Sequence, residues 1–272
     1  MFQEIHSTTN AVDAAAFVDT HCHLDDDSFA SDLDAVMDRS RELGVSRWIN
    51  VGFNPDRWQP SIDLADRFPG MSFMLGVHPG DARRWSDTVH ADLKELMERV
   101  PPVAIGEIGL DFYRGETNVE QQVTAFQSQL DLALERGLPA AIHMRSAESL
   151  VLEVIKSRYK TPPLLFHSYD GSDELTGWIL ANDAYVGVGG LATRTKSHHI
   201  HKQLRRFPLD RLLLETDSPY LVPNGFKHRR NTPESIPRIA AFVASLLDTE
   251  AGLIASQTTR NAERFFERLP PP

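Results

Sequence analysis

The sequence has little cysteine, no long hydrophobic run and a shortage of positive charge. Its 272 residues include one cysteine, Cys22, which excludes an internal disulfide and agrees with a reducing compartment. No stretch approaches the roughly 18 apolar residues of a membrane-spanning helix. Residues 1–16 lack the basic start and the apolar segment of a secretory signal. The sequence therefore predicts a cytoplasmic location and no membrane partner.

The charge balance limits the kinds of partner that the chain can bind broadly. Lys and Arg together number 28 against 38 Asp and Glu, a formal net charge of −10. This excludes general adhesion to polyanions or acidic membranes, so any contact with phosphate has to be local. The length and the 41% hydrophobic content suit one compact domain. We expect an N-terminal extension at 1–16, a single domain at 17–269 and no obligate protein partner.

The chain does contain a regular series of short apolar runs separated by helical patterns. Continuous apolar runs indicate strands covered on both faces, as in a parallel sheet, whereas 29–43, 119–136 and 147–159 have the three- and four-residue spacing of half-buried helices. Eight such units predict a (β/α)8 barrel, with an open doubly wound sheet as the alternative. The expected strands lie near 17–21, 47–51, 72–77, 102–107, 139–143, 163–167, 184–188 and 211–215. Gly44, Gly70 and Gly137 follow helical patterns and fit helix C-terminal caps.

Six of the apolar runs pass directly into histidine or a carboxylate. Because a barrel brings the carboxyl ends of its strands to one mouth, these side chains are expected to converge there. His21 and His23 are two residues apart on one strand, so both rings leave the same face. The strand ends carry His21 and His23, His78, Glu107, His143, His167 and Asp217.

Imidazole and carboxylate groups at one barrel mouth predict a metal centre. His21, His23, Glu107, His143, His167 and Asp217 give six donors, more than one catalytic ion needs. We expect two divalent ions, roughly 3.5–4 Å apart, bridged by Glu107. Four imidazoles favour zinc or manganese over magnesium. Such ions would activate a shared water for hydrolysis, with Asp217 as its general base.

Several of these residues have structural alternatives. Glu107 could pair with Arg114 or Arg145, and Asp217 could cap the turn at Ser218-Pro219. Glu215 shares the face of Asp217 and is either a ligand or an orienting group, while Asp19 could be a buried structural carboxylate. His198, His199 and His201 resemble an extra metal site but fall in an expected helix.

Six motifs contain the strand-end histidines and carboxylates: DTHCHLD (19–25), GVHPGDA (76–82), AIGEIGLDFYR (104–114), IHMRSA (142–147), FHSYDGS (166–172) and LLLETDSPYLVP (212–223). They resemble the motifs of the TatD-like metal-dependent hydrolases, a family of the amidohydrolase superfamily. The resemblance runs from about Asp19 to about Phe266 and implies a (β/α)8 barrel. It also implies metal ligands at the six donors named above and a place for His78 near the substrate phosphate. Ser168, Asp170 and Thr232 depart from the family pattern and leave the donors intact.

The resemblance implies a divalent-metal phosphodiesterase, typically a nuclease that removes nucleotides from DNA ends. We therefore expect a 3′–5′ deoxyribonuclease with a nucleic-acid substrate, DNA ahead of RNA. Beside His78, the expected substrate contacts are Tyr113, Arg114 and Arg145, since arginine suits phosphate. Lys227 to Arg230 could also bind phosphate or could form a solvated loop, and Phe112, Tyr113 and Tyr169 could stack on bases or pack the rim. The alternative function is hydrolysis of an ester or amide, such as an aminoacyl-nucleic-acid ester.

Overall fold

The computed structural model describes residues 17–115 and 118–271, and within them eight parallel strands form a barrel. Each strand pairs with the next in sequence, from the first to the eighth. A bridge between Cys22 and Ser218 then joins the two ends of the sheet. The strands are β1 (Phe17–Cys22), β2 (Val45–Gly52), β3 (Met71–Leu75), β4 (Ala104–Asp111), β5 (Ala140–Arg145), β6 (Leu164–Phe166), β7 (Tyr185–Val188) and β8 (Leu212–Leu214).

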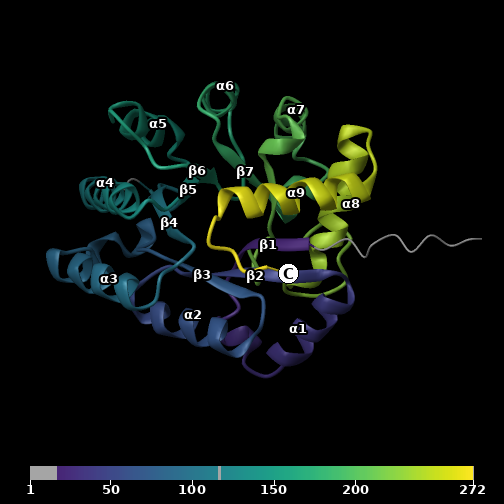
Figure 1. Ribbon diagram of the computed structural model, residues 1–272. Helices are drawn as coiled ribbons and strands as arrows, with labels where there is room; N and C mark the ends of the chain where they lie inside the picture. Colours follow the sequence, from purple (N-terminus) through teal and green to yellow (C-terminus); the bar gives the residue numbers. More distant parts are fainter. Residues whose placement is uncertain (1–16, 116–117, 272) are drawn as a thin grey trace, which may run out of the picture.

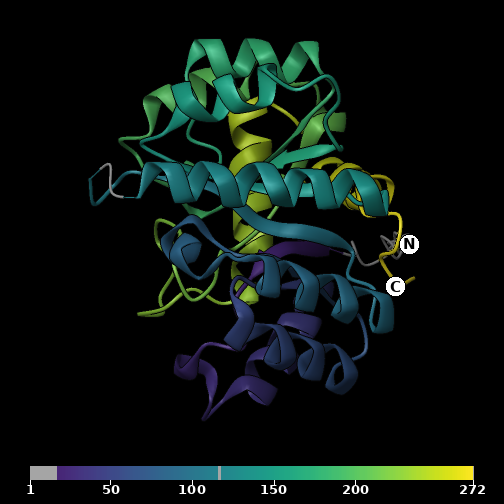
Figure 2. The same cartoon turned by 90° about the vertical axis from the view of Figure 1, so that its left-hand side faces the viewer.

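Helices surround the strands, as Figure 1 shows. Seen from the side, α4 lies between α3 and α5 and covers the outside of the barrel (Figure 2). The predicted (β/α)8 barrel is thus confirmed, and the open doubly wound sheet is excluded. The helices are α1 (Leu33–Glu42), α2 (Pro55–Arg67), α3 (Asp87–Arg99), α4 (Val119–Arg136), α5 (Glu148–Lys156), α6 (Asp173–Ala181), α7 (His198–Leu204), α8 (Ile236–Leu247) and α9 (Ala251–Phe265).

The element boundaries follow the sequence patterns with small differences. The helical pattern at 29–43 divides into a short 3-10 turn, Asp27–Phe29, and α1. Gly44, Gly70 and Gly137 have φ angles of 88°, 86° and 62°, a region where a side chain is strained, so glycine suits these helix ends. The predicted extension at 1–16 lies outside the described residues, and the domain limits 17–269 stay a prediction.

The inside of the barrel is filled by apolar side chains from the strands. Val18, Ile49, Met74 and their neighbours form one cluster with Phe265 and Phe266 at the end of α9. In Figure 1, α9 lies in front of the strands. Since Val18 lies near the start of β1, α9 closes the amino-terminal end of the barrel. The opposite end is left for polar side chains.

Polar contacts join β1 to the segment that follows β8. The buried Asp19 carboxylate accepts hydrogen bonds from the Thr216 amide (2.9 Å) and the Thr216 hydroxyl (2.6 Å). The Asp217 amide donates to the His21 carbonyl at 2.8 Å, and the His23 amide donates to the Ser218 carbonyl at 2.7 Å. Asp19 therefore has the structural role left open by the sequence, and these bonds set Asp217 beside the two β1 histidines.

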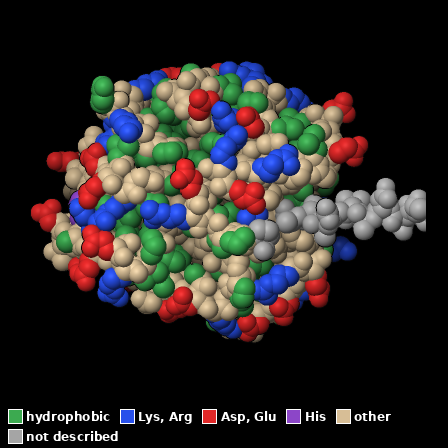
Figure 3. Space-filling model, viewed as in Figure 1, with side chains coloured by type: hydrophobic (Ala, Val, Ile, Leu, Met, Phe, Trp, Pro, Cys, Tyr) green, Lys and Arg blue, Asp and Glu red, His purple; other side chains and the backbone are tan. Residues whose placement is uncertain are grey.

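No single helix in the described ranges is long and apolar enough to cross a membrane, although Pro233–Leu247 and Ala251–Phe265, bent by 110°, meet that criterion together. The face that carries α9 mixes basic and acidic side chains (Figure 3).

Candidate metal centre

The six predicted ligands converge at the carboxyl ends of β1, β4, β5, β6 and β8. Glu107 lies at the middle of the group and is 5% exposed. Its Oε2 atom is 2.9 Å from His167 Nε2, 3.2 Å from His143 Nδ1 and 3.8 Å from His21 Nε2. Its Oε1 atom is 3.7 Å from His23 Nε2. One carboxylate thus faces four imidazoles, and no arginine is needed to explain its burial.

The electrostatics of Glu107 follow from this arrangement. Burial by itself raises the pKa of the carboxyl group, but the charge of His167 and the hydrogen bonds from His143 and His167 outweigh it. The pKa of Glu107 is therefore held well below its usual range. An ionised carboxylate in this position suits a site for cations.

The β1 histidines supply buried nitrogen atoms that the described residues leave without hydrogen-bond partners. These atoms are both ring nitrogens of His21 and Nδ1 of His23. The His21 ring stacks on His167 with centroids 4.0 Å apart, and burial, with positive charge on His167, lowers the pKa of His21 well below its usual value. A buried polar atom without a partner costs roughly 1–3 kcal/mol. A metal ion would satisfy the ring nitrogens of His21 and, once His23 has lost its proton, those of His23, so the donors fit a metal centre.

Among the described residues, four groups of three have their ligand atoms within 4.8 Å of one another, and two of these groups together contain the six donors. One donor set is His21, His23 and Asp217, and the other is Glu107, His143 and His167. The remaining two groups are His21 with His167 and Glu215, and His143 with His78 and Asp111. Asp217 Oδ1 lies 3.3 Å from His23 Nε2 and 3.8 Å from His21 Nε2. Two adjacent sets of three are the geometry expected if the centre holds a pair of ions.

Glu215 lies behind the centre with an exposed fraction of zero. One carboxylate oxygen accepts a hydrogen bond from the Ser168 amide and lies 3.8 Å from His167 Nδ1. A Cβ atom at Gly187 would meet the other oxygen at 2.0 Å, so glycine makes room for this carboxylate. Burial raises the pKa of Glu215 to about 7. Its place behind His167 favours the orienting role over that of a ligand.

His78 lies beside the centre rather than within the six donors. Its ring centroid is 4.3 Å from that of His143, and its Nδ1 atom accepts a hydrogen bond from the Gly80 amide at 2.9 Å. Burial, together with the charge of His143, lowers the pKa of His78 to about 3. The neutral ring therefore carries its proton on Nε2, which is free to donate to a substrate.

Asp111 is a site residue that the sequence reasoning missed. Its Oδ2 atom is 3.0 Å from His143 Nε2, and its Oδ1 atom accepts the Tyr113 amide at 2.9 Å. A carboxylate on the far nitrogen of a metal-binding histidine fixes the orientation of the ring. The spacing in the sequence could have identified Asp111, because it follows Glu107 by four residues on β4 and so lies on the same face of the strand.

We expect Asp111→Asn to weaken metal binding about 10- to 100-fold, because the amide no longer holds the His143 ring by its charge. Isothermal titration with zinc or manganese would measure the affinity, and thermal unfolding would check the fold. Asp38→Asn, which changes an exposed carboxylate on α1 paired with Arg41, serves as the control. Unchanged affinity in Asp111→Asn would remove this positioning role.

The candidate substrate contacts divide into exposed and structural groups. The Arg145 guanidinium lies 3.6 Å from the centroid of the exposed Tyr113 ring, and Arg114 is also exposed. Arg230 instead pairs with Asp32 at 2.6 Å, which gives this member of the 227–230 cluster a structural partner.

Tyr169 and the histidines of α7 have structural partners outside the metal centre. Tyr169 is buried, packs against Phe207 and bonds to the Thr176 hydroxyl, so the prediction that it could stack on bases is wrong, and its packing alternative holds. His198 and His199 begin α7, as expected, and the exposed His199 pairs with Asp170.

Comparison with known proteins identifies the group to which this chain is related. The family model described as TatD related DNase matches residues 18–267. The chain belongs to this family. An Erwinia tasmaniensis protein named 3′-5′ ssDNA/RNA exonuclease TatD is 36% identical over 255 residues, covering 91% of this chain and 98% of that protein. A Bacillus subtilis relative, the uncharacterized metal-dependent hydrolase YabD, is 32% identical and is covered to 98%.

The fold of a solved relative agrees with the sequence comparison. The crystal structure of YJJV, a TatD homologue from Escherichia coli, superimposes with a TM-score of 0.88 at 31% identity. The match covers 93% of this chain and 99% of that one. Membership of the TatD family confirms the predicted class, a metal-dependent hydrolase that acts on phosphodiester bonds.

Proposed function

We propose that this chain is a 3′–5′ exonuclease that removes nucleotides from single-stranded nucleic acid, with DNA as the expected substrate and two divalent ions as cofactors. The observation that carries the proposal is the Glu107 carboxylate, which lies 2.9–3.8 Å from ring nitrogens of four histidines at the barrel mouth. The names of the curated relatives support exonuclease activity on single strands. A cytoplasmic location and independence of a protein partner stay predictions.

The donor sets indicate which residues would hold the ions. His21, His23 and Asp217 would hold one, His143 and His167 would hold the other, and Glu107 would contact both. The number of imidazoles favours zinc or manganese over magnesium. When bound, such ions lower the pKa of water and offset negative charge on phosphoryl oxygens.

The side chains around the ions have distinct tasks in this proposal. Asp217 would orient the attacking water and accept its proton. His78 would donate from Nε2 to a non-bridging phosphate oxygen, a role that its neutral state and its bond to Gly80 support. Arg145, Arg114 and Tyr113 would hold the strand beyond the scissile bond.

The function is tested by a time course on end-labelled single- and double-stranded DNA and RNA, with each metal in turn. We expect a ladder of products shortened from the 3′ end, formed fastest from single-stranded DNA. An aryl ester assayed in parallel tests the alternative of ester hydrolysis. Cleavage of the ester with no shortening of any oligonucleotide would overturn the nuclease proposal.

Metal binding should strengthen as the pH rises. Burial opposes the charged form of His23 and His143, but carboxylates outweigh it: Asp217 and Glu107 raise the pKa of His23 to about 9, and Asp111 and Glu107 raise that of His143 to about 9. Both rings must lose a proton to bind metal, so the apparent affinity should rise about tenfold per pH unit for each proton displaced.

The pH effect can be measured by competition with a chelator between about pH 6 and pH 8. Titration calorimetry in buffers of different ionisation enthalpy would count the protons released. In the metal-free protein, the protonated forms of these two histidines stabilise the fold, so their effect on stability changes with pH in the opposite direction. Their contribution is complete below the ordinary pKa of histidine and is lost as the pH rises through about 9. An affinity independent of pH would contradict the proposed ligation by these rings.

A further inference from the structure

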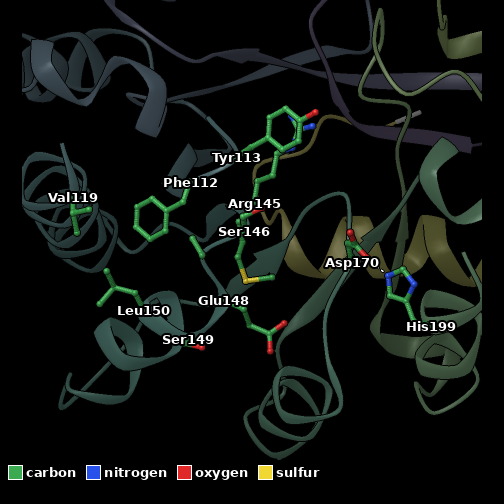
Figure 4. Close-up of a pocket in the computed structure, with 12 residues that line it drawn as sticks. Phe112, Tyr113, Val119, Arg145, Ser146, Glu148, Ser149, Leu150, Asp170 and His199 are labelled. Carbon is green, nitrogen blue, oxygen red and sulfur yellow. Dashed lines mark hydrogen bonds and ion pairs between the residues drawn. The ribbon is translucent and has the colours of Figure 1, made fainter. Parts of the chain in front are cut away.

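A cavity of about 900 Å³ is lined by residues at and beyond the carboxyl ends of β4, β5 and β6, and the six proposed metal donors are not among its lining residues. Its lining is linked to the centre through Asp111, which contacts both His143 and the Tyr113 amide. Arg145 also ends the same strand as His143, and Asp170 follows His167 by three residues. Figure 4 shows Tyr113 and Arg145 at one end, Phe112 and Leu150 on one side, and Asp170 with His199 on the opposite side. Sites for small ligands occupy roughly 300–1,000 Å³.

The lining favours a flat ligand with amino groups over an anion. Phe112 and Leu150 give an apolar side, and Glu148 and Asp170 place two carboxylates among the lining residues. The lining cation Arg145 lies at the end that carries Tyr113 (Figure 4), so a phosphate away from that end would face the two carboxylates. Glu148 contacts Ser172 and Asp170 contacts His199, and each carboxylate has further lone pairs that can accept hydrogen bonds.

We propose that this cavity is a nucleobase subsite for a base flanking the scissile phosphodiester bond, and that Asp170 makes it prefer bases with an exocyclic amino group. This inference rests on the proposed nuclease function and adds a specificity to it. Adenine, cytosine and guanine can donate an amino N–H to a carboxylate. Thymine and uracil present carbonyl oxygens on both sides of their one ring N–H, and these oxygens repel the same carboxylate.

The position of Arg145 agrees with a base entering from the mouth. Its guanidinium lies on the Tyr113 ring, 3.6 Å from the centroid, and both side chains are exposed. A strand that places a base in the cavity would bring its backbone phosphate past this cation. Because the base has to leave its stack to enter, the subsite selects single strands over duplexes.

The test compares single-stranded oligonucleotides that differ only in their last two nucleotides. For the metal-loaded wild-type protein, we expect kcat/KM for dA, dC and dG ends to exceed that for dT ends about tenfold. Asp170→Asn replaces the carboxylate by an amide that both donates and accepts hydrogen bonds. The ratio of kcat/KM between dA, dC or dG ends and dT ends should therefore fall to within about twofold. His199→Ala removes only the partner of Asp170 and should leave the preference at least as large.

Asp183→Asn is the matched control, because Asp183 is also an exposed carboxylate in an ion pair, with Arg211 at 2.7 Å. It should leave both the rate and the preference unchanged. Equal rates on all ends with the wild-type protein, or a preference unchanged in Asp170→Asn, would overturn the subsite alone. A wild-type protein that shortens no oligonucleotide would overturn the proposed function and the subsite with it.

Discussion

Glu107→Gln is expected to abolish metal loading and to lower kcat/KM for oligonucleotide hydrolysis on the order of 10⁴-fold. Glu107 faces all four histidines of the centre, so its side chain is placed to contact both proposed ions. The amide has nearly the same shape, but it removes the buried negative charge. Asp217 would then be the only carboxylate among the six donors, and its charge would be too small to offset the repulsion between two adjacent cations.

Metal content by mass spectrometry and hydrolysis at saturating metal would measure the two effects separately. Glu98→Gln provides a control for the loss of one carboxylate, since Glu98 is an exposed residue of α3 paired with Arg136 at 2.8 Å. Thermal unfolding of both variants would show whether the fold is retained. If Glu107→Gln bound the wild-type amount of metal and kept its activity within about tenfold, Glu107 would not be the bridging ligand.

The barrel and the six donors were predictable because sequence order and space coincide in this fold. Each strand of a parallel barrel ends at the same mouth, so a residue that follows an apolar run is placed there whatever its distance along the chain. His21 and Asp217 are 196 positions apart by their numbers, yet the Asp217 amide bonds to the His21 carbonyl. The position of each donor at the end of its own apolar run was sufficient to predict that these residues lie close together.

Contacts that depend on the register between strands were not predictable from single runs. Asp111 reaches His143 because β4 and β5 pair with Gly109 beside His143 and Asp111 beside Arg145. The sequence left the 227–230 cluster open between a phosphate contact and a solvated loop, and Arg230 in fact pairs with Asp32, far away in the sequence. Such partners are chosen by packing between elements, which a local pattern does not contain.

Asp217→Asn is expected to lower kcat about 10²- to 10⁴-fold while excess metal restores the occupancy of the centre. Asp217 has φ of 56°, a left-handed conformation that asparagine tolerates. The hydrogen bond from its backbone amide to the His21 carbonyl does not involve the side chain. The variant should therefore fold with its side chain in the same place, beside His23 Nε2.

The two proposed roles of Asp217 predict different losses. An asparagine oxygen can still act as a weak ligand, so metal affinity falls but is recovered by adding metal. The amide cannot accept a proton from water, so the rate of the chemical step does not recover. Single-turnover hydrolysis at rising metal concentration, with metal content measured on the same samples, separates them. Full recovery of kcat at saturating metal would leave Asp217 as a ligand and assign the base to another group.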